Sequence, residues 1–139
     1  MSTTIATLAE HDVHVAHVLT PPPSHAAIVR ELLGLGIGAL VEKPFALSSA
    51  EGRELAELAR SRGLALGVNH NHRFHPTFRR LEERLAAGDI GRLEHVQATW
   101  SMPLGQLDAG RLDDWMLRAP RNIIFEQGPH PLSQVHALC

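Results

Sequence analysis

The chain has few of the features that mark secreted, membrane-spanning or nucleic-acid-binding proteins. Its one cysteine is Cys139, so no disulfide can form within the chain, which suits a reducing compartment. No apolar run approaches the roughly 20 residues that a membrane span needs, and residues 1–10 lack the basic-then-apolar pattern of a signal peptide. The 139 residues carry a net charge of −2 and no basic stripe, which argues against a nucleic-acid partner. We therefore expect a cytoplasmic protein.

A glycine-rich phosphate-binding loop is also missing. Gly34, Gly36 and Gly38 lie close together, but they follow an expected helix and precede an expected strand. A dinucleotide-binding loop has the opposite order, because its glycines follow a strand and open the helix whose N-terminus meets the pyrophosphate. We interpret these glycines as the end of one element and a place of tight packing.

Three short apolar segments predict strands that alternate with helices. The expected strands are residues 13–19, 37–41 and 64–68. The first is apolar on both faces apart from His14 and His17, which is typical of a strand with helices on both sides and predicts that both histidines are buried. The short links between strands and helices indicate a parallel, doubly wound sheet.

The expected helices have recognisable ends. Ser24 is the predicted N-cap of the helix after the first strand, and Ser48 with Glu51 forms a capping-box pattern before the second. Gly63 suits the position just past a helix, where a positive φ is needed. A further amphipathic helix is expected at residues 76–87.

The hydrophobic pattern changes in the last third of the chain. Val96, Ala98 and Trp100 alternate with polar residues, which predicts a half-exposed strand. Because the earlier strands are apolar throughout, this change indicates a new layer. We therefore predict two domains, residues 1–90 and residues 91–139.

Each expected strand runs directly into a polar motif, at residues 20–23, 42–44 and 69–73. Parallel strands bring these motifs to one sheet edge, where open α/β sheets bind ligands. Pro44 disfavours a helical backbone at Lys43, so this lysine stays extended at the strand end. A lysine beside apolar walls can exchange protons with a substrate hydroxyl. The alternative is that the charges of this motif are simply solvated.

Glu126 and His130 stand four residues apart in a last expected helix, residues 122–138, which Pro129 and Pro131 interrupt or start. A carboxylate beside an imidazole can orient the ring and raise its basicity, as a general base requires. The alternative is an ordinary exposed pair on one helix face.

The ten histidines raise a third possibility, a metal-dependent hydrolase, because neutral imidazole is a common zinc ligand. His70, His72 and His75 are close in sequence, and His130 and His136 follow later. None of these groups has a recognised ligand spacing. We therefore predict no metal site.

Four stretches, taken in order, resemble the Gfo/Idh/MocA oxidoreductases, which are named for glucose–fructose oxidoreductase, inositol dehydrogenase and a rhizopine catabolism protein. The stretches are residues 18–25, 41–45, 67–74 and 126–130. They span nearly all of this chain but only the middle of a family member. The resemblance implies an α/β fold, with a partial Rossmann-like parallel sheet followed by the start of an α+β substrate domain.

The resemblance also implies hydride transfer between NAD or NADP and the hydroxyl or carbonyl group of a small-molecule sugar or polyol. The residues implied as catalytic are Lys43, His130 and Glu126, the last where the family usually has aspartate. Those implied at the cofactor are Thr20, Pro21, Glu42, Lys43 and Asn69. Those implied at the substrate are Arg73, Trp115 and Arg118.

Compared with a complete family member, the sequence has no first β-α-β unit and stops before most of the second domain. The expectation is an internal fragment of such an oxidoreductase, which forms a homo-oligomer at full length. The alternative is a catalytically silent remnant or interaction module, because half of a Rossmann sheet leaves an edge strand and one face uncovered.

Overall fold

The computed structural model describes residues 4–139. The chain divides after Asn69 into two compact units. The domain boundary expected after residue 90 stays a prediction. None of the helices formed by residues 4–139 combines the length and the apolar character needed to span a bilayer.

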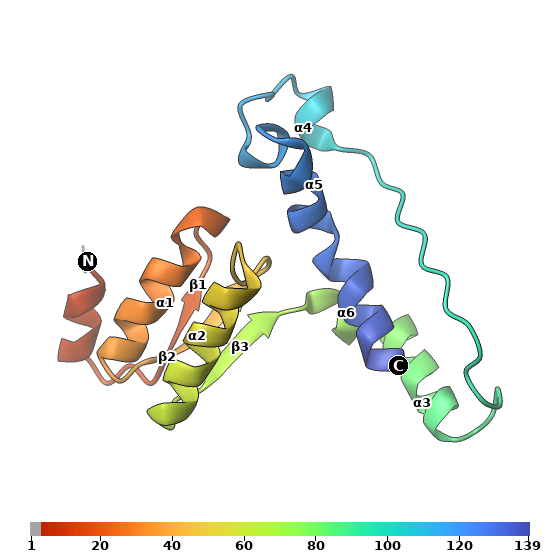
Figure 1. Ribbon diagram of the computed structural model, residues 1–139, viewed down its shortest axis with the longest axis horizontal. Coiled ribbons are helices and arrows are strands. Elements are labelled where there is room, and N and C mark those ends of the chain that lie inside the picture. The colour runs from red at the N-terminus through yellow and green to blue at the C-terminus, as the bar shows by residue number, and fades with distance from the viewer. Residues whose placement is uncertain (1–3) are drawn as a thin grey trace. The chain divides into compact units, whose positions relative to one another are not determined.

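The first unit contains a parallel sheet of three strands (Figure 1). The strands are β1 (Val15–Val18), β2 (Gly38–Glu42) and β3 (Leu66–Asn69), paired in the order β1-β2-β3. Val18 pairs in register with Val41, and Glu42 pairs with Asn69. The predicted parallel sheet is therefore confirmed, with the strand exits on one edge.

The helices of this unit begin and end largely where local signals predict. They are the 3₁₀ helices η1 (Ile5–Glu10) and η2 (Pro22–Ser24), and the α-helices α1 (His25–Gly34) and α2 (Ser49–Ser61). The Ser48 hydroxyl accepts a hydrogen bond from the Glu51 amide at 3.2 Å, so the capping box forms. The Glu51 carboxylate reaches back to the Leu47 amide at 3.1 Å. Gly63 has the expected positive φ, of 65°.

The predicted N-cap at Ser24 is wrong. Its hydroxyl lies 2.8 Å from both Thr20 Oγ1 and the Pro21 carbonyl oxygen, and it caps no amide of α1. The reason is that Ser24 ends η2 with a helical backbone, φ −95° and ψ −12°, whereas an N-cap residue normally has an extended backbone.

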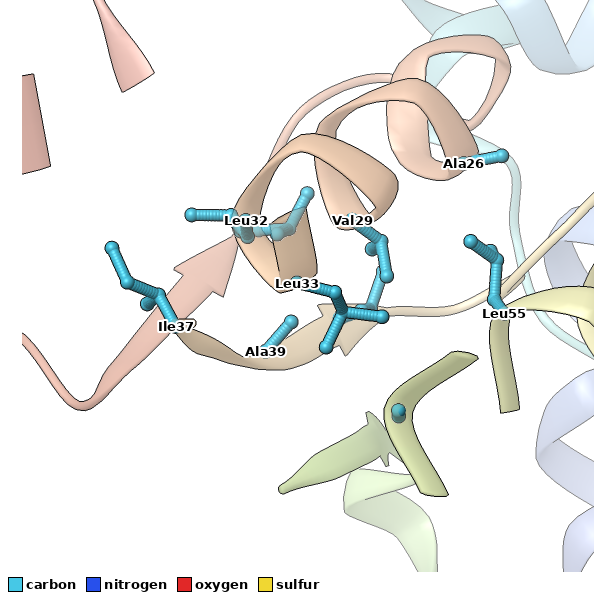
Figure 2. Close-up of a cluster of buried hydrophobic side chains, with 10 residues drawn as sticks. Ala26, Val29, Leu32, Leu33, Ile37, Ala39 and Leu55 are labelled. Carbon is cyan, nitrogen blue, oxygen red and sulfur yellow. The ribbon is translucent and has the colours of Figure 1, made fainter. Parts of the chain in front are cut away.

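The core of the first unit lies between the sheet and its two α-helices, as Figure 2 shows for part of the cluster. Its buried members are Val18, Ala26, Val29, Leu32, Leu33, Ile37, Ala39, Val41, Leu55 and Ala59. Most are aliphatic side chains from α1 and β2, with Leu55 and Ala59 from α2. Burial of these apolar groups, at roughly 25 cal/mol per Å² removed from water, is the main stabilising contribution in this unit.

Only one face of the sheet is covered. Ala39 and Val41 are buried, whereas Leu40 between them is 37% exposed. His17 pairs in register with Leu40 and is also exposed. The predictions that helices cover both faces of β1 and that His14 and His17 are buried are therefore wrong for the described residues. The physical reason is that α1 and α2 contribute to one core cluster on a single side.

The second unit is built mainly from short helices. They are η3 (Asn71–Phe74), α3 (Pro76–Ala86), α4 (Gly105–Asp108), η4 (Trp115–Leu117), α5 (Pro120–Gln127) and α6 (Pro129–Leu138). The helix predicted at residues 76–87 is confirmed. The last expected helix is interrupted at Gly128, as its prolines predicted. A Cβ at Gly128 would lie 2.4 Å from the Ile124 carbonyl oxygen, so only glycine lets α6 follow α5 this closely.

The half-exposed strand predicted around Val96, Ala98 and Trp100 does not form. Residues 93–104 have no regular secondary structure. A strand needs a neighbouring strand to satisfy its backbone donors and acceptors, and every strand among residues 4–139 belongs to the first unit. An alternating sequence is therefore not sufficient here.

Candidate active site

Two predicted cofactor residues meet at the carboxyl edge of the sheet. Glu42 and Asn69 end β2 and β3 and pair in register. The Asn69 side-chain amide donates a hydrogen bond of 2.5 Å to Glu42 Oε1. His17 Nε2 lies 3.8 Å from the same oxygen. The carboxylate of Glu42 is thus held by groups on both neighbouring strands.

Lys43 follows β2 directly and is half-buried. Its peptide bond to Pro44 is cis, and Pro44 is buried. The lysine therefore stands at the end of the central strand of the sheet, next to Glu42. This is the placement that the sequence predicted for it.

Thr20 and Pro21 lie just beyond the end of β1 and are both exposed. The Thr20 hydroxyl is 2.8 Å from the Ser24 hydroxyl. Because a hydroxyl can both donate and accept, Thr20 can still bond a ligand from this position. The exits of all three strands thus present polar or rigid groups at one edge of the first unit.

Sequence reasoning missed His25, which lies between two of these exits. Its ring is fully buried, with Nε2 2.7 Å from the Thr20 carbonyl oxygen and Nδ1 2.9 Å from the Pro44 carbonyl oxygen. The available signal was its position, directly after a proline-rich strand exit and inside a stretch that carries the family resemblance. Nothing in that pattern identified its partners.

Three predicted substrate residues belong to the second unit and make local contacts there. Arg73 pairs with Glu82 at 3.2 Å. The Arg118 side chain donates from Nε to the Asp113 carbonyl oxygen at 2.8 Å. The carbonyl oxygen of Trp115 accepts a 2.7 Å hydrogen bond from the Asn122 side chain. Trp115 and Arg118 therefore help to order the loop before α5, and their role at a substrate stays a prediction.

His130 is buried in an aromatic cluster within the second unit. Its ring centroid is 4.1 Å from that of His72 and 5.6 Å from that of Trp100, onto which it stacks with an interplanar angle of 22°. Glu126 lies on α5, four residues before His130 on α6, across the break at Gly128. The aromatic neighbours fix the plane of the His130 ring, which is a requirement for a directional proton acceptor.

A depression of about 360 Å³ in the second unit is lined by His70, Arg73, Pro129, Leu132, Ser133 and His136. Burial, followed by the nearby charge of Arg73, lowers the pKa of His70 below its usual 6.5. His70 Nδ1 and Arg73 Nε are buried without a hydrogen-bond partner. These groups suit the polar or anionic part of a small molecule.

Among residues 4–139, no group of three or more histidine, cysteine, aspartate or glutamate side chains is arranged to hold a metal ion. Of the imidazoles that suggested a hydrolase, those of His72 and His130 pack against each other, and those of His70 and His136 line the depression described above. The third possibility therefore gains no support from the arrangement of these side chains.

Comparison with known proteins gives an independent indication. Residues 2–70 match a family described as oxidoreductases with an NAD-binding Rossmann fold. The trans-1,2-dihydrobenzene-1,2-diol dehydrogenase of Bos taurus is 38% identical over 104 residues, which cover 75% of this chain and 30% of that enzyme. The chain thus spans less than a third of the length of this curated relative.

Solved structures show the same fold. Myo-inositol 2-dehydrogenase from Lactobacillus plantarum aligns with 99% of this chain and 41% of its own, with a TM-score of 0.82 and 16% identity. GenD2 from gentamicin A biosynthesis, solved in complex with NAD, aligns with 99% of this chain and 39% of its own, with a TM-score of 0.76 and 25% identity. The α/β fold class is confirmed, and the chain belongs to the Gfo/Idh/MocA family of oxidoreductases.

Proposed function

We propose that this chain supplies the nicotinamide edge and part of the substrate region of an NAD(P)-dependent dehydrogenase. The observation that carries the proposal is the Glu42-Lys43-Pro44 motif at the end of the central strand, with Asn69 bonded to Glu42 on the neighbouring strand. Ligands of open α/β sheets bind outside the carboxyl ends of the strands. The motif therefore stands where a cofactor and its substrate would meet.

The residues present fit the nicotinamide end of the cofactor. A flat ring with a carboxamide needs a rigid wall and polar partners, which Pro21, the exposed Thr20 hydroxyl and Asn69 supply at this edge. When bound, nicotinamide gives or takes a hydride at its ring carbon. The sequence contains no glycine loop of the kind that holds a pyrophosphate, so the support from this chain concerns the nicotinamide end.

In this proposal, Lys43 and His130 handle the proton of the substrate hydroxyl. As the carbinol carbon gives up a hydride, the hydroxyl proton passes to one of these basic groups and a carbonyl forms. Glu126 orients His130 or the substrate, with the longer arm of glutamate where aspartate is usual. The proposal requires both basic groups to reach one substrate.

The proposed substrate is a sugar or polyol. Two relatives are named for a dihydrobenzenediol and for myo-inositol, both of which carry hydroxyl groups on a ring. The polar, cationic lining of the depression near His70 and Arg73 is compatible with such a molecule. Assembly into a homo-oligomer and a cytoplasmic location stay predictions alongside this one.

Titration of the purified chain with NADH, followed by nicotinamide fluorescence, tests the proposal. A saturable change in fluorescence is expected. Lys43→Ala should keep most of the binding but lower any turnover by about 100-fold or more, the usual contribution of a positioned proton-transfer group. Arg53→Ala is the matched control, because it removes an exposed cation from α2 without touching the strand exits. A wild-type chain without any NADH response would contradict the proposal.

Lys43 is the only lysine of the chain, which allows a sharper test. Reductive methylation with a ¹³C-labelled reagent marks its amine and the amino terminus alone. NAD⁺ should shift the Lys43 signal and leave the terminal signal as an internal reference. Equal shifts of both signals, or of neither, would count against a cofactor at the end of β2.

The interaction module remains a second candidate, because the first unit exposes apolar side chains on its uncovered sheet face and at its edge strand. Val15, Leu19 and Leu40 are all exposed. Exposed apolar strands of this kind favour association. Sedimentation of the wild-type chain and of Leu40→Glu tests this second candidate, since an interaction module should associate through this sheet face and lose that association in the variant.

A further inference from the structure

His25 joins the exits of two neighbouring strands. It is the first residue of α1 and is 0% exposed. Its Nε2 lies 2.7 Å from the carbonyl oxygen of Thr20, beyond β1, and its Nδ1 lies 2.9 Å from the carbonyl oxygen of Pro44, beyond β2. One side chain therefore contacts the main chain of both motifs that flank the proposed cofactor edge.

These two contacts require a specific state of the ring. Carbonyl oxygens only accept hydrogen bonds, and a neutral imidazole carries a single N–H donor. Both contacts are hydrogen bonds at the same time only when each ring nitrogen carries a hydrogen.

The two hydrogen bonds of His25 lie beyond the residues that are paired in the sheet. Pairing between β1 and β2 ends at Val18 and Val41. Thr20 and Pro44 lie beyond this pairing, so their relative position depends on contacts other than the β-ladder. His25 supplies such a contact on each side, next to Pro21 in one motif and next to Lys43 in the other.

We propose that His25 is a positioning residue, a double hydrogen-bond donor that fixes the main chain after Lys43 relative to the exit of β1. Part of this inference, the benefit to cofactor binding, rests on the proposed function. The geometric part does not, because it concerns the position of Lys43 in the chain alone. His25 acts through the backbone and touches neither substrate nor cofactor.

A residue that merely filled the core would behave differently. An aliphatic side chain of similar size would fill the same volume, but it would leave the Thr20 and Pro44 carbonyl oxygens without these donors. His25→Leu therefore removes both bonds while keeping the volume, and His25→Gln retains one amide donor. His14→Gln is the matched control, because the His14 side chain is 82% exposed in the same unit.

The first measurement is nitrogen NMR of the imidazoles in the full wild-type chain. A doubly donating His25 should give two nitrogen shifts typical of N–H. One protonated and one unprotonated nitrogen at His25 would overturn the double bridge. This measurement needs no variant, so a failure of His25→Leu to fold does not remove the test.

The second measurement uses the ¹³C-methylated amine of Lys43. His25→Gln should shift or broaden the Lys43 signal in the folded chain, whereas His14→Gln should leave it unchanged. A lower urea midpoint for His25→Gln with an unchanged Lys43 signal would indicate a merely structural role and would overturn the proposal.

NADH titration separates this inference from the proposed function. His25→Gln should weaken NADH binding by about tenfold, and His14→Gln should not. If the wild-type chain binds no NADH, the proposed function fails, while the Lys43 signal still decides whether His25 positions that residue. If NADH binds equally well to wild type and His25→Gln, the inference fails and the proposed function stands.

Discussion

The two units of the chain are stabilised by different kinds of contact. Among residues 4–139, ten buried apolar side chains belong to the first unit, whereas the second contributes Phe78 and Met116. The first unit places its candidate residues at the ends of paired strands. The second places them on short helices and loops around an aromatic cluster. Candidate residues in the first unit are therefore held by a cooperative core, and those in the second are held by local contacts. Local unfolding of the second unit should therefore cost less free energy than unfolding of the first.

The largest expected difference between the units is in amide hydrogen exchange. Amides of β2 are paired on both sides, whereas residues 93–104 have no regular structure. We expect β2 amides to exchange at least about 1,000 times more slowly than those of residues 93–104, as measured by NMR or mass spectrometry of the full chain. Strong protection at Val96, Ala98 and Trp100 would show that this segment pairs as a strand, and the contrast between the units would fail.

A core substitution should unfold the first unit before it affects the second. Leu33 is fully buried between α1 and the sheet, so Leu33→Ala should lower the free energy of unfolding by about 2–5 kcal/mol. Urea denaturation followed by circular dichroism measures this loss. The control is Leu107→Ala in the second unit, where Leu107 is exposed, and a change within about 0.5 kcal/mol is expected. Similar losses in both variants would contradict the comparison.

The second unit should be the more sensitive to acid, because burial and Arg73 lower the pKa of His70 below 6.5. The unfolded chain then binds this proton more readily than the folded chain, so stability falls as pH decreases below about 6.5 and is unaffected above it. The effect should be smaller than that of Leu33→Ala, since His70 is only partly buried. Unfolding midpoints of wild type and His70→Gln at about pH 5.5 and about pH 8 measure it. An equal pH dependence in both proteins would exclude His70 as the cause.

The smallest effect is expected from the ion pair between α1 and α2. Arg30 donates from Nε and from its terminal nitrogen to both carboxylate oxygens of Glu54, at 2.8 and 2.6 Å, on the surface. The hydrogen bond from Arg30 holds the pKa of Glu54 below its usual 4.5, so any stabilisation is present above that pH and is lost as pH falls through the lowered value. Glu54→Gln should change the urea midpoint slightly, and high salt should reduce the difference.

The control for that pair is Glu31→Gln, which removes an exposed charge from α1. If Glu54→Gln destabilises the chain as much as Leu33→Ala does, the packing of α1 against α2 depends on the ion pair more than on the apolar core. That result would weaken the distinction drawn between the two units.

Local sequence signals predicted much of the first unit. The capping box at Ser48 and Glu51 and the positive φ at Gly63 depend on residues a few positions apart, and both were predicted correctly. The strand-end position of Lys43 followed from an apolar run and the proline after it. The predictions that failed depend on distant parts of the chain. His14 and His17 are exposed because helices cover one sheet face, and Trp100 lies outside any strand because no neighbouring strand pairs with its segment.

The amino-acid sequence by itself determined the alternation of strands and helices, the order of the polar motifs and the family. These features depend on side-chain periodicity, on the residues that start or end a helix or strand, and on motif spacing. Only the tertiary structure decided which groups meet at the sheet edge. Asn69 bonds to Glu42 from 27 residues away, and His25 reaches Pro44 from 19 residues away. Such contacts arise from strand register and from the packing of α1 on the sheet, and no local pattern in the sequence specifies either.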